Sequence, residues 1–417
     1  MTPGMGSLQQ PPPAPPQTGL LLTGGGARAA YQVGVLEALS TLRRECAAQG
    51  AGNPFPIIAG TSAGAINAAA LACGADDFEH AVRRIARVWR NFHVQHVYRA
   101  DSLSALRSGA RWITLLSLGW ALARWSRLRP RSLLDNAPLE QLLARMVPLA
   151  RLPALIRQGH LRALAVTASS YTSGEHVTFF EAGERLEPWV RSQRHAVHTR
   201  ITADHLMASS AIPFLFPAVA LDLQGRPAYF GDGSMRQVAP IAPAIHLGAE
   251  RVLVIGAGRM HEPHEAGALQ AQASYPTLAQ IAGHALSSIF LDTLSLDVER
   301  ARRINQTLSL IPEEVRTRSA LRPVELLVIA PSQRLDALAA RHLGALPATV
   351  RALLGVLGVS IQNSDARGAA LASYLLFEPG YTRELMALGR ADTMRQREAV
   401  CRFFGWSLEQ NKPQTHA

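Results

Sequence analysis

The sequence contains almost no lysine, and its basic residues are not clustered. Lys412 is the only lysine, so the net charge of +11 comes almost entirely from arginine. The arginines are dispersed along the chain and form no run of five or six like charges. Basic arms that bind nucleic acid usually show such runs. We therefore expect no nucleic-acid partner.

Cysteine is also scarce, which excludes two common structural devices. Cys46, Cys73 and Cys401 are odd in number, and none has a cysteine or histidine at zinc-ligand spacing. This pattern argues against both a disulfide framework and a zinc site. A reducing compartment fits best, so we expect a cytoplasmic protein that needs no metal and no other cofactor.

Long apolar runs are missing as well. No stretch reaches the roughly 18 residues needed to span a bilayer. Residues 1–17 carry no charge and no apolar segment of signal-peptide type, and their prolines and glutamines predict a disordered tail. The full sequence is 48% hydrophobic and 18% charged, as in ordinary globular proteins.

What the sequence does contain is an alternation of short apolar runs and helical segments. The helical spacing of Val35, Leu39 and Leu42 is typical of the segments between the runs. Short apolar strands separated by helices predict an α/β protein with a largely parallel sheet covered on both faces. In such sheets, ligands bind at the carboxyl ends of the strands. The predicted strands are 18–24, 55–60, 162–169, 176–182, 227–233, 251–258 and 324–331.

Three consecutive glycines, Gly24, Gly25 and Gly26, follow the first predicted strand and precede a helix. Without side chains, their backbone N–H groups can approach a bound phosphate or the oxyanion of an acyl-transfer intermediate. The run also fits the loose dinucleotide pattern G-x-G-x-x-A. That pattern requires an acidic residue about 20 positions later, at the end of the next strand, and the next strand ends at Ser62 instead. Dinucleotide binding and a simple tight turn stay open as alternatives.

The second strand end carries Gly60-Thr61-Ser62-Ala63-Gly64, which has the G-x-S-x-G pattern of a nucleophile elbow. In that motif, small residues flank the serine because strand and helix pass close together at a sharp turn. A small-residue turn with an N-capping serine is the structural alternative. Because a glycine loop precedes this motif by one strand–helix unit, where an oxyanion hole would lie, we interpret Ser62 as a nucleophile.

The residue that accepts the serine proton is less clear from the pattern alone. Asp232 lies at a predicted strand end between two glycines, so its carboxylate can approach another loop without obstruction. A turn-forming Asp-Gly pair is its structural alternative. His261 and His264 also follow a strand closely enough to reach the same edge. A carboxylate can serve as the base only if burial raises its pKa towards the working range.

The order of these blocks resembles the patatin-like phospholipase family. The matching blocks lie at 24–28, 60–64, 208–213 and 232–233, in the family's order and at similar spacing. They read Gly-Gly-Gly-Ala-Arg, Gly-Thr-Ser-Ala-Gly, Ala-Ser-Ser-Ala-Ile-Pro and Asp-Gly. Ala29 stands where the family usually has glycine. The resemblance covers about residues 18–243.

The resemblance implies a three-layer α/β/α fold and a serine–aspartate dyad that works without histidine. It implies that Ser62 is the nucleophile, that Asp232 is the general base, and that residues 24–26 with Arg28 form the oxyanion hole. From the pattern along the chain, we expect the acyl-hydrolase domain to span 18–330, with an insertion at about 90–160 that interrupts the alternation of strands and helices. A mostly helical C-terminal extension is expected at 331–417. The elbow and supporting glycines of these motifs are Gly60, Gly64 and Gly233.

The family's substrates are lipid esters, so the resemblance predicts a lipid acyl hydrolase, with phospholipid the first candidate. A soluble carboxylesterase or thioesterase with the same dyad and a non-catalytic lipid-binding relative are the alternatives. The segment from Trp112 to Trp125 carries three tryptophans beside several arginines. Such a segment can lie in the headgroup plane of a membrane, which would give a peripheral contact. A buried helix of the insertion is the other interpretation.

Overall fold

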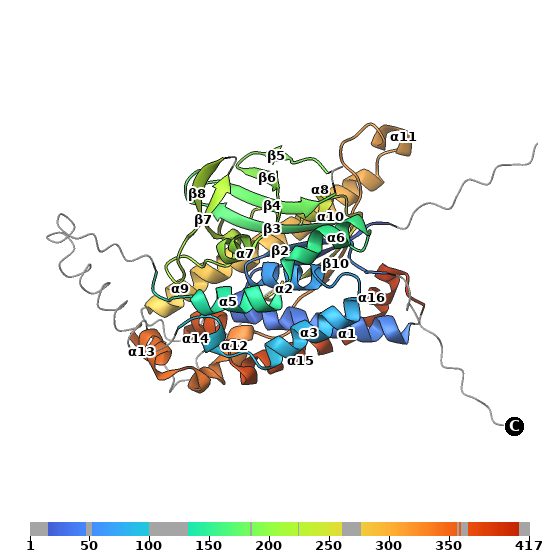
Figure 1. Cartoon of the computed structure of the whole chain (residues 1–417). Coiled ribbons are helices and arrows are strands. Elements are labelled where there is room, and N and C mark those ends of the chain that lie inside the picture. The colour runs from blue at the N-terminus through green and yellow to red at the C-terminus, as the bar shows by residue number, and fades with distance from the viewer. Residues whose placement is uncertain are drawn as a thin grey trace, which may run out of the picture.

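The computed structural model describes residues 16–46, 52–99, 132–183, 186–223, 225–260, 277–356, 358–359 and 366–407. Within these residues, ten strands form one sheet in the order β10-β9-β1-β2-β3-β4-β6-β5, with β8 paired to β3 and β7 paired to β8 (Figure 1). The strands are β1 (Thr18–Leu22), β2 (Ile57–Thr61), β3 (Ala163–Ser170), β4 (His176–Ala182), β5 (Val190–Arg191), β6 (Arg194–His198), β7 (Val219–Leu223), β8 (Arg226–Asp232), β9 (Arg251–Ile255) and β10 (Glu325–Ile329).

The sheet is mixed, with one half that is parallel and another that contains both parallel and antiparallel pairs. Strands β10, β9, β1, β2 and β3 are mutually parallel, as predicted. The seven predicted strands are all present, but β4 and β8 run antiparallel to β3. The sequence does not predict β5, β6 and β7, because none of them is a continuous run of buried apolar residues.

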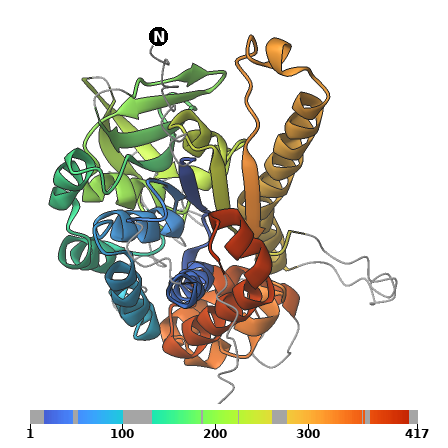
Figure 2. The same ribbon diagram turned by 90° about the vertical axis from the view of Figure 1, so that its right-hand side faces the viewer.

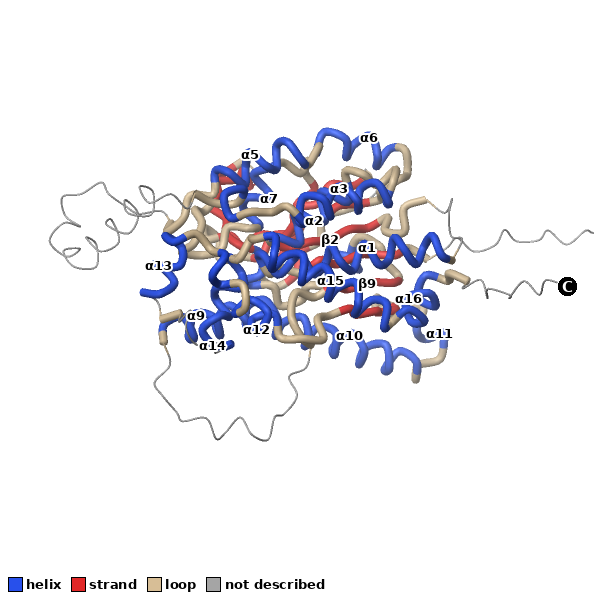
Figure 3. Tube along the Cα trace, turned by 90° about the horizontal axis from the view of Figure 1, so that it is seen from below, coloured by secondary structure: helices blue, strands red, loops and turns tan. Residues whose placement is uncertain are grey.

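Helices cover both faces of the sheet (Figures 2 and 3). Buried side chains between the helices and the sheet form two hydrophobic cores. Side chains alternate across a strand, so Leu20 and Leu22 of β1 enter one core and Leu21 enters the other. The first core is covered by α1 (Ala30–Glu45), α2 (Ala63–Ala72), α3 (Phe78–Arg90) and α15 (Pro379–Arg395). The second is covered by α8 (Ala242–His246) and α10 (Thr293–Ser309). This is the three-layer α/β/α arrangement that the sequence predicted.

The other helices lie at the edges of these layers. None of the helices in the described ranges is both long enough and apolar enough to cross a membrane. These edge helices are α5 (Ala137–Met146), α6 (Leu152–Arg157), α7 (Ala203–Ser209), α9 (Leu278–Ser287), α11 (Glu313–Arg316), α12 (Leu335–Ala340), α13 (Ala348–Val356), α14 (Ala366–Leu375) and α16 (Arg397–Phe404). Two short 3₁₀ helices are η1 (Gly26–Ala29) and η4 (Gly233–Arg236).

Helix α15, from the C-terminal part of the chain, lies directly along α1 (Figure 3). The two backbones approach so closely that a Cβ added at Gly34 would lie 1.9 Å from the Met386 carbonyl oxygen. The buried Tyr31 hydroxyl donates a hydrogen bond of 2.9 Å to Asp392 of α15. The C-terminal helices therefore share the first core with the N-terminal half of the chain.

Candidate active site

The strand register brings Ser62 and Asp232 to the same place in the sheet. Strand β2 pairs with the first part of β3 and ends at Thr61, which lies opposite Thr167. Where β2 ends, β8 takes its place beside β3, and Asp232 lies opposite Ala168. Ser62 directly follows β2, and Asp232 is the last residue of β8. The ends of two strands that approach from opposite directions therefore meet beside β3.

Ser62 occupies a strained turn between β2 and α2. Its backbone has φ 56° and ψ −132°, which is unusual for a residue with a side chain. The turn is tight, since a Cβ at Gly60 would lie 2.6 Å from the Gly64 carbonyl oxygen. The close packing at Gly60 leaves no room for a side chain, and Ser62 lies at the apex of the turn.

The glycine loop packs against this elbow. A Cβ at Gly64 would lie 2.3 Å from the carbonyl oxygen of Leu22, the last residue of β1. Gly24 and Gly25 lead from there into η1, and Gly26 has φ +55°. In the described part of the chain, no acceptor takes the backbone N–H of Gly26 or Ala63. Both residues line the same pocket as Ser62, so two unused donors lie near the serine.

The Asp232 carboxylate is fully buried. Its Oδ1 atom accepts a hydrogen bond of 2.9 Å from the Ser234 N–H, while Oδ2 has no partner among the described residues that satisfies hydrogen-bond geometry. Burial raises the pKa of Asp232 to about 6, against the smaller opposing effects of the Ser62 hydroxyl and Ser234. The Asp-Gly turn is held close to the sheet, because a Cβ at Gly233 would lie 2.1 Å from the Thr167 carbonyl oxygen.

The Ala-Ser-Ser-Ala-Ile-Pro block supports both residues of this pair, a role that the sequence analysis did not assign. The Ser209 hydroxyl accepts the Ser62 N–H at 2.9 Å and donates to the Thr167 carbonyl at 2.6 Å. The Ala211 carbonyl accepts the Asp232 N–H at 2.9 Å. Ser209 thus fixes the strained elbow from behind. The sequence hints at this role only through the position of the block, which lies between the serine and aspartate motifs.

Arg28 is buried and faces the C-terminal helices. Its Nε donates a hydrogen bond of 2.8 Å to the Ser373 hydroxyl of α14, and its guanidinium lies 4.0 Å from the centre of the Tyr374 ring. A Cβ at Gly26 would lie 2.3 Å from the Tyr374 carbonyl oxygen. Helix α14 therefore packs against the glycine loop from the side of η1.

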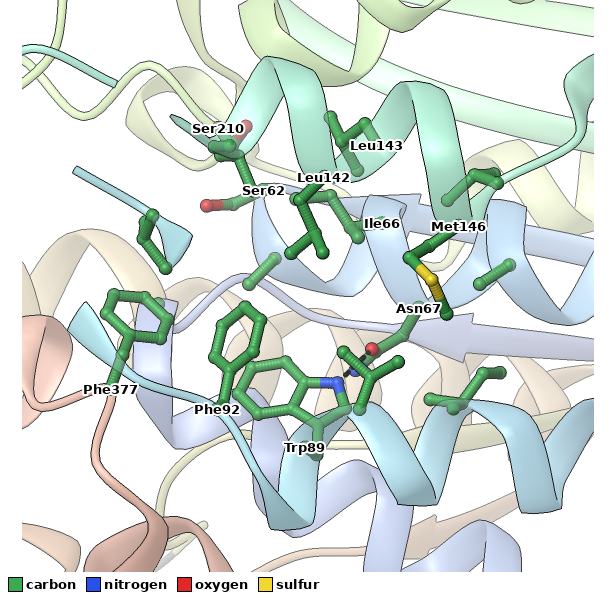
Figure 4. A pocket seen from close by; sticks show the side chains of 18 of the residues that line it. Ser62, Ile66, Asn67, Trp89, Phe92, Leu142, Leu143, Met146, Ser210 and Phe377 are labelled. Atoms are coloured by element: carbon green, nitrogen blue, oxygen red, sulfur yellow. Dashed lines mark hydrogen bonds between the residues drawn. The ribbon is translucent and has the colours of Figure 1, made fainter. Parts of the chain in front are cut away.

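An apolar pocket extends from Ser62 between α2, α3 and α5 (Figure 4). Its empty space, with the mouth included, is about 860 Å³. Polar side chains in its wall form hydrogen bonds with other protein groups. The Trp89 Nε1–H donates to Asn67 Oδ1 at 2.8 Å, and Arg84 donates to the Met146 carbonyl. Helix α5 belongs to the predicted insertion, so part of this insertion forms one wall. Apolar lining residues include Ile66, Val88, Phe92, Leu142, Leu143 and Phe377.

The family model for patatin-like phospholipases matches residues 20–245 of the chain. The protein belongs to the patatin-like phospholipase family. The match spans the glycine loop, the elbow, the Ser209 block and the Asp-Gly turn, and it ends before β9. Membership in this family implies hydrolysis of lipid esters.

Three solved structures match most of the chain at low sequence identity. VipD from Legionella pneumophila is 14% identical, with 93% of this chain and 68% of that chain covered and a TM-score of 0.35. The type III effector ExoU is 16% identical, with 86% and 77% covered and a TM-score of 0.27. ExoU in the ExoU–SpcU complex from Pseudomonas aeruginosa is 16% identical, with 94% and 75% covered and a TM-score of 0.26. No curated protein matches the chain in sequence.

Two of the sequence-based expectations for this patatin-like protein concern residues that the structure does not describe. His261 and His264 lie outside the described residues, as does the segment from Trp112 to Trp125. Within the described residues, no group of three or more histidine, cysteine or acidic side chains is arranged to hold a metal ion. That the protein needs no metal and no other cofactor stays a prediction.

Proposed function

We propose that the protein hydrolyses carboxylic ester bonds of lipids, phospholipids among them, with Ser62 as nucleophile and Asp232 as general base. The observation that supports this proposal is that Ser62 lies beside the buried Asp232 carboxylate and also lines the apolar pocket. A pocket with an apolar wall beside a nucleophile suits an acyl chain better than a polar substrate.

In the first half of the proposed reaction, the Ser62 hydroxyl oxygen attacks the ester carbonyl carbon while its proton passes to Asp232. The carbonyl oxygen becomes negatively charged, and the N–H groups of Gly26 and Ala63 are the donors that we assign to it. When the tetrahedral intermediate collapses, the bond to the alcohol oxygen breaks. The alcohol leaves with the proton from Asp232, and the acyl group stays on Ser62.

In the second half, a water molecule gives its proton to Asp232 and attacks the acyl carbon. Collapse of this intermediate returns the proton to Ser62 and releases the fatty acid. Arg28 has a positioning role in this scheme, because its side chain contacts α14 and anchors the loop that carries Gly26. A carboxylate with a pKa near 6 can both accept and return a proton close to neutral pH.

A fluorophosphonate probe tests the nucleophile directly. The probe should label the protein, and peptide mapping should locate the adduct on Ser62. Ser210 is the matched control, since it lines the same pocket but its hydroxyl donates to the Leu206 carbonyl at 2.6 Å. Labelling of Ser62→Ala at the wild-type rate, or an adduct on Ser210, would contradict the assignment. Incubation with mixed phospholipid vesicles, followed by mass spectrometry of released acids, tests the lipid substrate.

The pocket also predicts a dependence on acyl-chain length that one substitution should change. Leu142 lies between Ser62 and Met146 along the pocket (Figure 4). Leu142→Trp should exclude at least two methylene groups of a long chain, each worth about 0.8 kcal/mol of burial, and so lower kcat/KM for long-chain esters about tenfold or more. Hydrolysis of a butyrate ester should change little.

The control for this experiment is Leu278→Trp, because Leu278 is exposed at the start of α9 and does not line the pocket. It should leave the ratio of long-chain to short-chain kcat/KM unchanged. An equal loss on butyrate and palmitate esters in Leu142→Trp would mean that the pocket does not hold the acyl chain.

A further inference from the structure

A second pocket, unlike the first, is lined by cationic and imidazole groups. It lies between α8 and the hairpin of β5 and β6, elements that Figure 1 shows at the edge of the sheet. Its empty space of about 280 Å³ includes the solvent at its open mouth, so the enclosed part is small. One wall is the Trp189 ring, which stacks on His246 with ring centres 4.7 Å apart. The charged or titratable lining residues are His176, Arg191, Arg194, His195 and His246.

The strand register places three of these groups in one row. His176 of β4 is paired with Arg194 of β6, and Arg194 is paired with Arg191 of β5. Residues directly opposite in neighbouring strands point to the same face, and like charges in such positions destabilise a sheet. Among the described residues, neither arginine has a carboxylate within 4 Å. This row therefore has an unfavourable charge arrangement that an anion would relieve.

Acidic groups near the row are already engaged elsewhere. Glu175 lies 3.6 Å from His195, and Asp297 Oδ2 accepts the Ile241 N–H at 3.0 Å. Burial raises the pKa of Asp297, while the charge of Arg194 is a smaller effect that lowers it. Arg194 thus acts on Asp297 only at longer range.

His176 gives a second, independent indication of a ligand. Only 3% of the residue is exposed, yet its Nε2 atom has no hydrogen-bond partner among the described residues. Burial, and after it the charge of Arg194, lowers the pKa of His176 to about 4, so the ring is neutral at pH 7. Buried polar atoms of folded proteins nearly always have a partner. The ring also interacts with the backbone of Gly233, the residue after Asp232.

We propose that this pocket binds a phosphate group of the monoester type, carried by a small metabolite or by a lipid headgroup. Guanidinium groups bind phosphate oxygens through paired, charge-assisted hydrogen bonds. A phosphate monoester is anionic and at neutral pH still carries a proton in part of the population. It can therefore satisfy two arginines and also offer a donor to the His176 nitrogen. The proposal does not depend on the hydrolase reaction.

Isothermal titration calorimetry with inorganic phosphate and glycerol 3-phosphate tests the site on the full chain. The wild type should bind with one site per chain, and Arg194→Gln should weaken binding at least tenfold. The matched control is Arg302→Gln, which removes an exposed arginine of α10 and should bind like the wild type. Equal binding by wild type, Arg194→Gln and Arg302→Gln, or no saturable binding, would overturn the proposal.

Thermal unfolding gives a readout that a merely structural role would not produce. Without phosphate, Arg191→Gln should raise the melting temperature by relieving the like-charge row, whereas phosphate should raise that of the wild type more than that of the variant. A lower melting temperature of Arg191→Gln in both conditions would mean that Arg191 has a stabilising role within the fold, against the proposal.

Vesicles separate the two sources of the phosphate group. For a lipid headgroup, phosphatidic acid vesicles should retain the wild type more strongly than Arg194→Gln, and inorganic phosphate should compete. For a small ligand, glycerol 3-phosphate should bind while vesicle retention of wild type, Arg194→Gln and Arg302→Gln stays equal. Phosphatidylcholine vesicles at the same ionic strength correct for membrane attachment without an anionic lipid.

Discussion

Replacing Asp232 with asparagine should lower kcat by about 10²-fold or more on any ester substrate, because the general base of the proposed dyad is lost. Asparagine has nearly the same shape, and its oxygen can still accept the Ser234 N–H that now bonds to Oδ1. The fold should therefore persist, which circular dichroism can check. Steady-state hydrolysis of a short soluble ester measures kcat without a contribution from membrane binding.

The same substitution should raise stability while it removes activity. The pKa of Asp232 is raised from 3.8 to about 6, so the folded state disfavours the ionised carboxylate. This cost is absent below about pH 4, grows as pH rises towards 6, and is complete above it. At pH 7, Asp232→Asn should unfold at a higher temperature than the wild type. Wild-type kcat should fall as pH drops through about 6, where the base becomes protonated.

Asp297 provides the matched control for this experiment. It is another buried aspartate whose pKa is raised by burial, but its Oδ2 accepts the Ile241 N–H in the second core. Asp297→Asn should leave kcat within a few-fold of the wild type. His261→Ala and His264→Ala should each change kcat by less than about tenfold. If either histidine variant is as inactive as Asp232→Asn, the enzyme uses a Ser-Asp-His triad.

The sequence predicted the strand ends well because short apolar runs bounded by glycine have few other interpretations. The direction of β8 was not predictable in the same way. Apolar content and spacing indicate a strand, but they do not indicate which neighbour it pairs with. The sequence therefore predicts that Asp232 lies at the end of a strand. It does not predict that Asp232 lies beside Ser62, because that proximity depends on the antiparallel pairing of β8 with β3.

The cationic pocket could not be predicted from the sequence for a related reason. His176, Arg191 and Arg194 are ordinary surface-type residues in the sequence, and β5 is only two exposed residues long. They form a row only after β4, β6 and β5 pair in register. Gly34 and Gly389 did carry a usable signal, since an isolated glycine inside a helical pattern often has a packing reason. The sequence does not indicate that α1 and α15 are the two helices that pack together at these glycines.

The boundary near residue 330 stays a prediction, and the contacts of the C-terminal helices indicate how to test it. Helix α15 covers α1 at Gly34 and Gly389, where a Cβ would lie about 2 Å from a backbone oxygen of the other helix. Helix α14 holds Arg28 through Ser373. Removing these helices would expose one side of α1 and of the glycine loop to water, although the family match itself ends at residue 245.

A chain that ends at Pro331 should therefore fail to fold, with most of the protein insoluble and no cooperative thermal unfolding. The physical reason is the loss of apolar cover over α1, at about 25 cal/mol per Å² of newly exposed surface, against a total stability of only about 5–15 kcal/mol. Soluble yield, circular dichroism and limited proteolysis measure the outcome. A chain that ends at Ser407 is the control and should behave like the full chain, since it keeps α12 to α16. Cooperative unfolding and undiminished ester hydrolysis in the chain ending at Pro331 would instead establish residues 331–417 as a separate extension.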